Sequence, residues 1–95
     1  MKRWKGRYVI VDNKRNVDSE MALCGFKITD VIEILVEGTR IKARGKGIHE
    51  KWFRCGKRIR IAVVEDCNDY WLLRHVGDGK ASRKKLKLMK TRGEE

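Results

Sequence analysis

The chain has no apolar stretch long enough to cross a membrane and no apolar core of a signal peptide. A spanning helix needs about 20 mainly apolar residues. The apolar run that follows the basic start, Tyr-Val-Ile-Val at residues 8–11, is far shorter than that and too short for a signal sequence. We therefore expect a cytoplasmic protein with no membrane partner.

Paired cysteines and clustered metal ligands are also lacking. Cys24, Cys55 and Cys67 are an odd number of thiols, and no two of them are spaced C-x-x-C. A disulfide framework needs an even set, and a zinc site needs ligands at close spacing. The sequence thus predicts free thiols, no metal site and no cofactor.

Motifs for serine catalysis and for nucleotide phosphates are missing as well. The two serines, Ser19 and Ser82, have no glycine elbow around them, and the Gly-Lys-Gly at residues 45–47 lacks the frame of a phosphate-binding loop. Any chemistry must therefore come from the remaining polar groups, mainly the two histidines and the many cations.

Basic residues are what the chain has in excess. Lys and Arg number 24 against 13 acids, which gives a net charge of +11 over 95 residues. We expect one domain over residues 1–95 with a modest core, residues 1–6 and 91–95 being loose. Such a charge favours a polyanionic partner, and RNA or DNA is the commonest.

The charges are segregated along the chain. Residues 16–38 carry one base and five acids, whereas residues 39–64 carry nine bases and one acid, and residues 80–95 seven bases and two acids. A surface that only kept the protein soluble would mix the signs, so this segregation indicates a one-sided binding face.

Hydrophobic periodicity predicts a strand followed by two helices. Residues 7–12 have the composition of a strand, and residues 17–24 have helical spacing with Gly25 as a left-handed stop. A second helix should begin near Ile28, with Thr29 or Asp30 as its cap, and end at Gly38. The two helices should form a helical hairpin.

The second half of the chain predicts strands and a terminal helix. Strand patterns cover residues 39–44, 48–55, 59–64 and 70–73, and the turn at residues 65–69 joins the last two into a central hairpin. Residues 77–79 should break the pattern before a basic helix within residues 81–92. The fold class is therefore α+β: an N-terminal strand, a helical hairpin, a four-stranded antiparallel meander and a basic C-terminal helix.

One end of the central hairpin is the predicted anion-binding site. Arg58 and Arg60 enter the hairpin while Arg74 and His75 leave it, so we expect them to meet. His75 could act as a base toward a ribose 2′-hydroxyl, with Arg74 and Arg60 stabilising the phosphate charge, a chemistry that needs no metal. His49 has the pattern of an exposed strand residue. The residues expected to bind nucleic acid are Lys51, Arg54, Lys57, Arg58, Lys80, Arg83, Lys84 and Lys85.

Short segments resemble a known family of toxins. The stretches at residues 12–16 (Asp-Asn-Lys-Arg-Asn), 24–31 (Cys-Gly-Phe-Lys-Ile-Thr-Asp-Val) and 80–84 (Lys-Ala-Ser-Arg-Lys) resemble motifs of BrnT-type toxins and related uncharacterised domains. Those proteins belong to the RelE/ParE-like superfamily of small ribonuclease toxins. Cys24 stands where the toxin motif has a histidine, and the family's Ser-Ala-Arg has no counterpart after residue 73.

The resemblance implies a metal-independent endoribonuclease that acts as the toxin of a toxin–antitoxin pair. Its partners would be RNA and an acidic antitoxin protein. The residues themselves leave two alternatives open, namely a non-catalytic module that binds RNA or DNA phosphates through a basic sheet face, and a protein-interaction domain. The oligomeric state stays open too.

Overall fold

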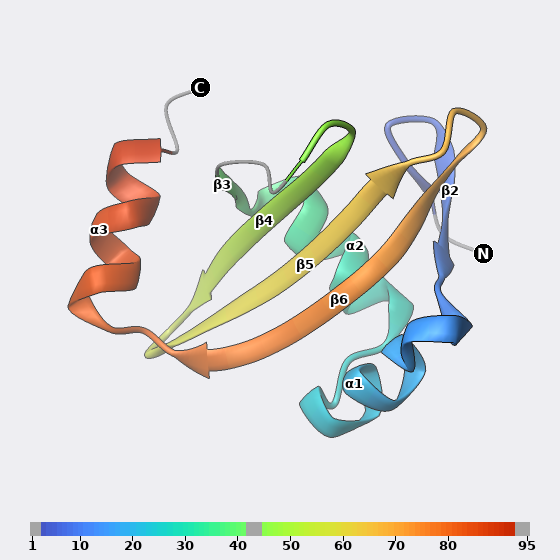
Figure 1. The fold of residues 1–95 in the computed structure, drawn as a ribbon. Helices are drawn as coiled ribbons and strands as arrows, with labels where there is room; N and C mark the ends of the chain where they lie inside the picture. The colour runs from blue at the N-terminus through green and yellow to red at the C-terminus, as the bar shows by residue number, and fades with distance from the viewer. Residues whose placement is uncertain (1–2, 42–44, 93–95) are drawn as a thin grey trace.

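The computed structural model describes residues 3–41 and 45–92. Six strands form a single sheet, two helices cover one of its faces, and a third helix stands at one end (Figure 1). The elements in chain order are β1 Arg3–Trp4, β2 Arg7–Val11, the 3₁₀ turn η1 Asn13–Arg15, α1 Val17–Cys24, α2 Ile28–Glu37, β3 Thr39–Ile41, β4 Ile48–Cys55, β5 Arg58–Asp66, β6 Tyr70–Lys80 and α3 Arg83–Arg92.

The sheet is mixed, which corrects the predicted topology. Its strand order is β1-β2-β6-β5-β4-β3. Strands β3 to β6 are antiparallel in sequence order, as the meander required, but β2 pairs with β6 in parallel and β1 adds an antiparallel edge. Strand β1 lies in a segment expected to be loose. It is held there because Trp4 is 6% exposed and belongs to the core.

The helical hairpin forms within the predicted boundaries. Gly25 ends α1 with φ of 71°, a left-handed conformation that glycine adopts without strain. The predicted cap of α2 is wrong, because the helix starts after Lys27. The carboxylate of Asp30 accepts the backbone N–H of Lys27 at 2.7 Å, so Asp30 acts from the first turn instead.

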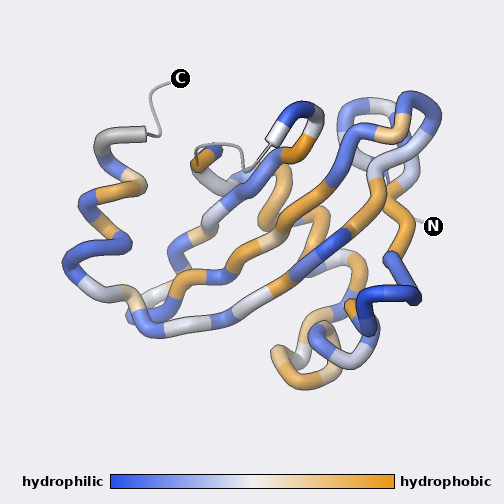
Figure 2. Tube along the Cα trace, in the orientation of Figure 1, coloured by the Kyte–Doolittle hydropathy of each residue, from blue (hydrophilic) through white to orange (hydrophobic). Residues whose placement is uncertain are grey.

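Two apolar clusters lie on opposite faces of the sheet. The larger one fills the space between the sheet and helices α1 and α2, and Figure 2 shows the hydrophobic stretches of β5 and α2 that supply it. The smaller one, Ile41, Trp52 and Ile59, packs against Leu86 and Met89 of α3. The predicted basic helix therefore exists and covers part of the second face. We call the rest of that face the open face.

Strand β6 is longer than predicted. Residues 77–79 do not break it, since Gly77 pairs with Ile61, and Lys80 pairs with Arg58. The predicted meeting of Arg74 and His75 with Arg58 is therefore wrong. Lys80 is six residues beyond Arg74, which is about 20 Å along a strand.

The strand predicted over residues 39–44 is seen only in its first half. Thr39–Ile41 form β3, and residues 42–44 lie outside the described part of the chain. Within the described ranges, no helix is long and apolar enough to span a membrane.

Candidate active site

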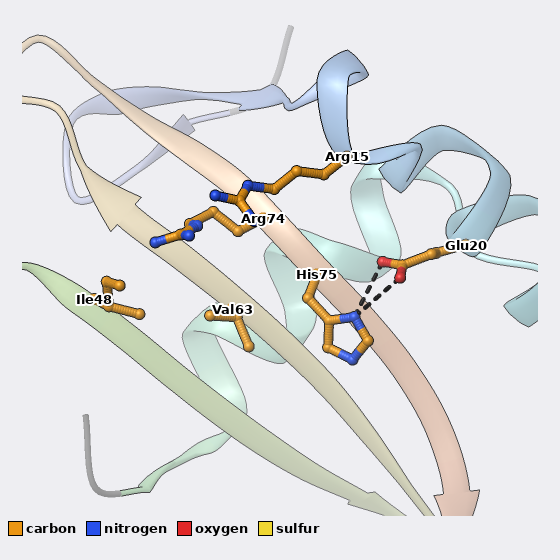
Figure 3. A pocket seen from close by; sticks show the side chains of 6 residues that line it. All are labelled: Arg15, Glu20, Ile48, Val63, Arg74 and His75. Atoms are coloured by element: carbon orange, nitrogen blue, oxygen red, sulfur yellow. Dashed lines mark hydrogen bonds and ion pairs between the residues drawn. The ribbon is translucent and has the colours of Figure 1, made fainter. Parts of the chain in front are cut away.

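A pocket of about 380 Å³ opens where β6 leaves its parallel neighbour (Figure 3). Ile48 of β4 and Val63 of β5 line it from the sheet, and Arg74 and His75 line it from β6. The remaining lining comes from a different part of the chain, namely Arg15 at the end of η1 and Glu20 of α1.

A β-bulge places two consecutive residues of β6 in this pocket. Val63 pairs with His75 and Val64 pairs with Leu73, so Arg74 is the extra residue. Leu73 and Val76 both belong to the core under the helices. A regular strand would turn alternate residues to opposite faces, whereas the bulge lets Arg74 and His75 line the same cavity.

Glu20 fixes the imidazole of His75. Both carboxylate oxygens lie 3.1 Å from Nδ1 of His75, and one of them also accepts the backbone N–H of Val76 at 3.2 Å. Strand β2 stops pairing with β6 at Leu73, so the Val76 N–H has no strand partner on this edge. Glu20 thus closes an exposed sheet edge and orients His75 with one side chain.

The Glu20 contact also decides which ring nitrogen can act as a base. An ionised carboxylate only accepts hydrogen bonds, so Nδ1 of His75 must carry the proton. In the neutral ring, Nε2 then holds a free lone pair. His75 has 40% of its side chain exposed, which leaves Nε2 accessible.

Two guanidinium groups line the same pocket as the histidine. Figure 3 shows the side chains of Arg15 and Arg74 side by side above His75. Arg15 Nε lies 3.2 Å from Asp12, and Arg74 Nη1 lies 3.4 Å from Glu65. These ion pairs are partly exposed and individually weak, and each leaves other N–H groups of the fork to bind an anion. Two adjacent cations repel one another, so an anion between them is favoured.

Of the three predicted catalytic residues, the structure brings together His75 and Arg74 and separates Arg60. Arg60 lies on the helix-covered face, where its guanidinium stands 5.1 Å from the centre of the Phe26 ring and 3.9 Å from Asp30. The cation that takes its place beside His75 is Arg15. The expected meeting of Arg60 with His75 relied on β6 ending near residue 76, and the longer strand, with Arg60 on the other face of the sheet, separates the two residues.

Most of the predicted nucleic-acid-binding residues gather at the other end of β6. There the β4–β5 turn, the end of β6 and the start of α3 meet, because Arg58 pairs with Lys80 and the N–H of Ala81 donates to the carbonyl of Lys57 at 2.8 Å. We call this cluster the basic end, and it consists of Arg54, Lys57, Arg58, Lys80, Arg83 and Lys84.

Within the basic end, the cations differ in their contacts. Arg58 makes an ion pair with Asp78 at 2.8 Å. Arg54 and Arg83 line a groove of about 620 Å³ whose other walls are Leu86, Lys87, Met89 and Lys90 of α3.

The last two predicted residues lie elsewhere. Lys51 stands on the helix-covered side, 5.9 Å from the Trp4 ring, where burial and then Lys5 and Arg40 lower its pKa. Lys85 lies over Gly79 of β6, between the basic end and the pocket.

His49 is half-buried, not exposed as predicted. Its ring stands edge-on to Trp71, with centroids 5.2 Å apart. Burial, followed by the charges of Arg40 and Lys5, lowers the pKa of His49 below its ordinary value of 6.5. This histidine lies in the packing between Trp71 and the edge strands and does not line the pocket.

Sequence reasoning missed Glu20 and Arg15. Glu20 belongs to the acidic stretch at residues 16–38, and Arg15 lies just before it. Glu20 and His75 are 55 residues apart in sequence. No local sequence spacing predicts such a pair, because the contact depends on how α1 lies against β6.

No group of three or more His, Cys, Asp or Glu side chains that could hold a metal ion occurs within residues 3–41 and 45–92. Comparisons of the chain with known protein families, with curated proteins and with solved structures found no match.

Proposed function

We propose that this protein is an RNA-binding, metal-independent endoribonuclease with His75 as its base. The observation that carries the proposal is the Glu20–His75 pair inside a pocket rimmed by two guanidinium groups. An imidazole that a carboxylate orients, in a pocket lined by two cations, supplies what phosphodiester transfer needs, namely a proton acceptor and stabilisation of charge on phosphate oxygens.

The ribose of the substrate provides the nucleophile in this mechanism. Nε2 of His75 takes the proton of a 2′-hydroxyl, whose oxygen attacks the adjacent phosphorus. The bond from phosphorus to the 5′-oxygen breaks, and that oxygen takes a proton from water. The products are a 2′,3′-cyclic phosphate and a 5′-hydroxyl end, and His75 returns its proton to solvent.

Arg74 and Arg15 bind the non-bridging phosphate oxygens in this scheme. Their forked N–H groups match the geometry of a phosphate, and their charge counters the charge that develops during attack. Glu20 does not touch the substrate. It keeps the proton on Nδ1 and stabilises the imidazolium that forms.

Cleavage of a labelled RNA in excess EDTA tests the proposal. The wild-type protein should cut it and leave cyclic or 3′-phosphate ends, and the same strand with a 2′-deoxy sugar at the cut position should stay intact. His75→Ala should lower the rate by about 10²- to 10⁴-fold. His49→Ala is the matched control, because it removes the other histidine of the chain from outside the pocket.

Three results would overturn the mechanism. They are loss of activity in EDTA, undiminished cleavage of the deoxy strand, or equal losses in the two histidine variants.

The resemblance to RelE/ParE-like toxins extends the proposal to a biological role. As a toxin, the chain should arrest growth when expressed alone, and an acidic antitoxin that covers the cationic surface should relieve the arrest. His75→Ala expressed at the same level should be harmless. Arrest by the His75→Ala protein would refute the link between toxicity and this pocket.

A second candidate is a module that binds nucleic acid without cutting it. The basic end favours this reading, because Lys80 lies about 17 Å along the strand from His75 and the cations around it can bind phosphates independently of the pocket. Binding of RNA or DNA with no cleavage of any RNA would favour this candidate, whereas a chain that binds neither would be better described as a protein-interaction domain.

A further inference from the structure

Two glycines lie on β6 between the pocket and the basic end. Gly77 pairs with Ile61 and Gly79 pairs with Ile59, and both isoleucines belong to the apolar cluster on the face that α3 partly covers. A Cβ on Gly77 would point toward Nε2 of His75, at 3.6 Å. His75, Gly77 and Gly79 therefore form one row along the same face of β6.

The fold itself does not require glycine at position 77. Neither Gly77 nor Gly79 has a positive φ. A Cβ at Gly77 would meet its nearest neighbours at 3.6 and 3.9 Å, which is ordinary van der Waals contact. Glycine inside a strand weakens the sheet, and it often marks a place where a ligand or another backbone approaches closely.

Gly79 has a different neighbour. A Cβ there would lie 2.8 Å from Nζ of Lys85, so the ammonium of this α3 residue stands directly over the bare backbone of β6. Lys85 is one of the predicted nucleic-acid-binding residues. Its charge lies on the line from His75 toward the basic end.

We propose that Gly77 forms the floor of a track that carries single-stranded RNA from the His75 pocket to Lys85, whose ammonium stands over Gly79. Lys85 then binds a phosphate farther along the strand than the one that is cleaved. This inference rests on the proposed function and adds the path of the substrate.

The pocket volume supports a single strand as the ligand. About 380 Å³ suits a small molecule such as one nucleotide. Single strands can place one unstacked nucleotide in such a pocket while their backbone continues along the surface, which a stacked duplex cannot do.

The test measures binding and cleavage separately at one salt concentration. Binding uses a fluorescein-labelled single-stranded eight-nucleotide RNA that is 2′-O-methylated throughout, so it cannot be cut. Cleavage uses dinucleoside monophosphates, which contain only the phosphate to be cleaved and cannot reach Lys85. Lys85→Ala should weaken octamer binding about tenfold, as loss of one charge-assisted phosphate contact does, and leave dinucleotide cleavage unchanged.

Lys27→Ala is the matched control, since it removes the same charge from an exposed position just before α2, outside the proposed binding residues. Equal weakening by Lys27→Ala and Lys85→Ala would mean that only general charge matters, and would overturn the track. Gly77→Ala provides a second arm, because its Cβ fits the fold. It should keep thermal stability and still weaken octamer binding severalfold, and unchanged binding would also contradict the proposal.

The two hypotheses can fail separately. If no RNA is cut but octamer binding still depends on Lys85 and Gly77, the track stands and the ribonuclease proposal fails. If RNA is cut and octamer binding ignores both substitutions, the track fails and the ribonuclease proposal stands.

Discussion

The carboxylate of Glu20 lies 3.1 Å from Nδ1 of His75, and the same carboxylate accepts the N–H of Val76 at the edge of β6. One side chain thereby couples the closure of a sheet edge to the orientation of the candidate base. Glu20 stands near the N-terminus of α1, where the helix dipole favours its negative charge. Stability and activity at this position should therefore respond differently to different substitutions.

Glu20→Gln should separate the two roles. Its amide oxygen can still accept the Val76 N–H, so the free energy of unfolding should change little, whereas the loss of charge should lower kcat about tenfold to a hundredfold at unchanged KM. Glu20→Ala should also lower the free energy of unfolding by about 1 kcal/mol. Glu33→Gln removes an exposed acid from α2 and is the control for a general charge effect. A parallel loss in that variant would contradict the positioning role.

Arg74 and Arg15 should matter for cleavage, and Arg60 should not. Each of Arg74→Ala and Arg15→Ala removes a cation beside the site of attack, and we expect losses of about 10²-fold in kcat/KM on a short RNA. Arg60→Ala removes the same charge from the helix-covered face, where it contacts Phe26 and Asp30. Rates for the three variants on one substrate check this order. An Arg60→Ala loss as large as the others would restore the site predicted from sequence.

Local signals explain what could be predicted about the fold. Helix α1 and strand β4 have the boundaries expected from sequence, because Gly25 stops the helix and the strand is bounded by glycine-containing turns. The parallel pairing of β2 with β6 has no local signal. This pairing depends on how all the strands are arranged in the sheet.

The candidate site was only half predictable for the same reason. His75 and Arg74 follow an apolar run and could be singled out by position. The bulge that brings them to one face depends on pairing with Val63 and Val64, and Gly77 and Gly79 look like a strand break because glycines usually mark turns. The predicted strand at residues 70–73 is a few residues too short, and this error places Arg60 beside His75, although Arg60 lies on the helix-covered face.

The buried face of α2 should dominate its contribution to stability. Ile34 is fully buried between helix and sheet, whereas Val36 on the same helix is 59% exposed. Ile34→Ala should lower the free energy of unfolding by about 2–5 kcal/mol, and Val36→Ala should change it by about 0.5 kcal/mol or less. Urea unfolding followed by circular dichroism measures both. Similar values for the two variants would mean that α2 packs differently.

His49 should make the folded state less stable in mild acid. Its pKa is lowered by burial, then by Arg40 and Lys5, with Asp66 acting in the opposite direction and Arg7 adding to the decrease. At pH values between the lowered pKa of His49 in the folded chain and 6.5, the unfolded chain binds more protons at this site than the folded chain. The stability due to neutral His49 is therefore complete above pH 6.5 and is lost as the pH falls through the folded value.

Two measurements check the His49 prediction. The NMR titration midpoint of His49 should lie below 6.5. In His49→Gln, the loss of unfolding free energy between pH 7.5 and pH 5.5 should be smaller than in the wild type. A midpoint at or above 6.5 would show that the ring is not packed against Trp71 as described.

The basic end should determine how RNA binding depends on salt. Each phosphate contact on a single strand contributes about −0.7 to the slope of log K against log salt concentration. Arg54 and Arg83 line the α3 groove, and removing either should make the slope shallower by about that amount for an RNA long enough to reach from the pocket. Arg60→Ala removes a cation of the helix-covered face and should leave the slope unchanged. Binding titrations at several salt concentrations give the slopes directly. If Arg60→Ala changes the slope as much as Arg54→Ala and Arg83→Ala do, the phosphates are not held at the basic end, because a localised interface depends on the cations that line it.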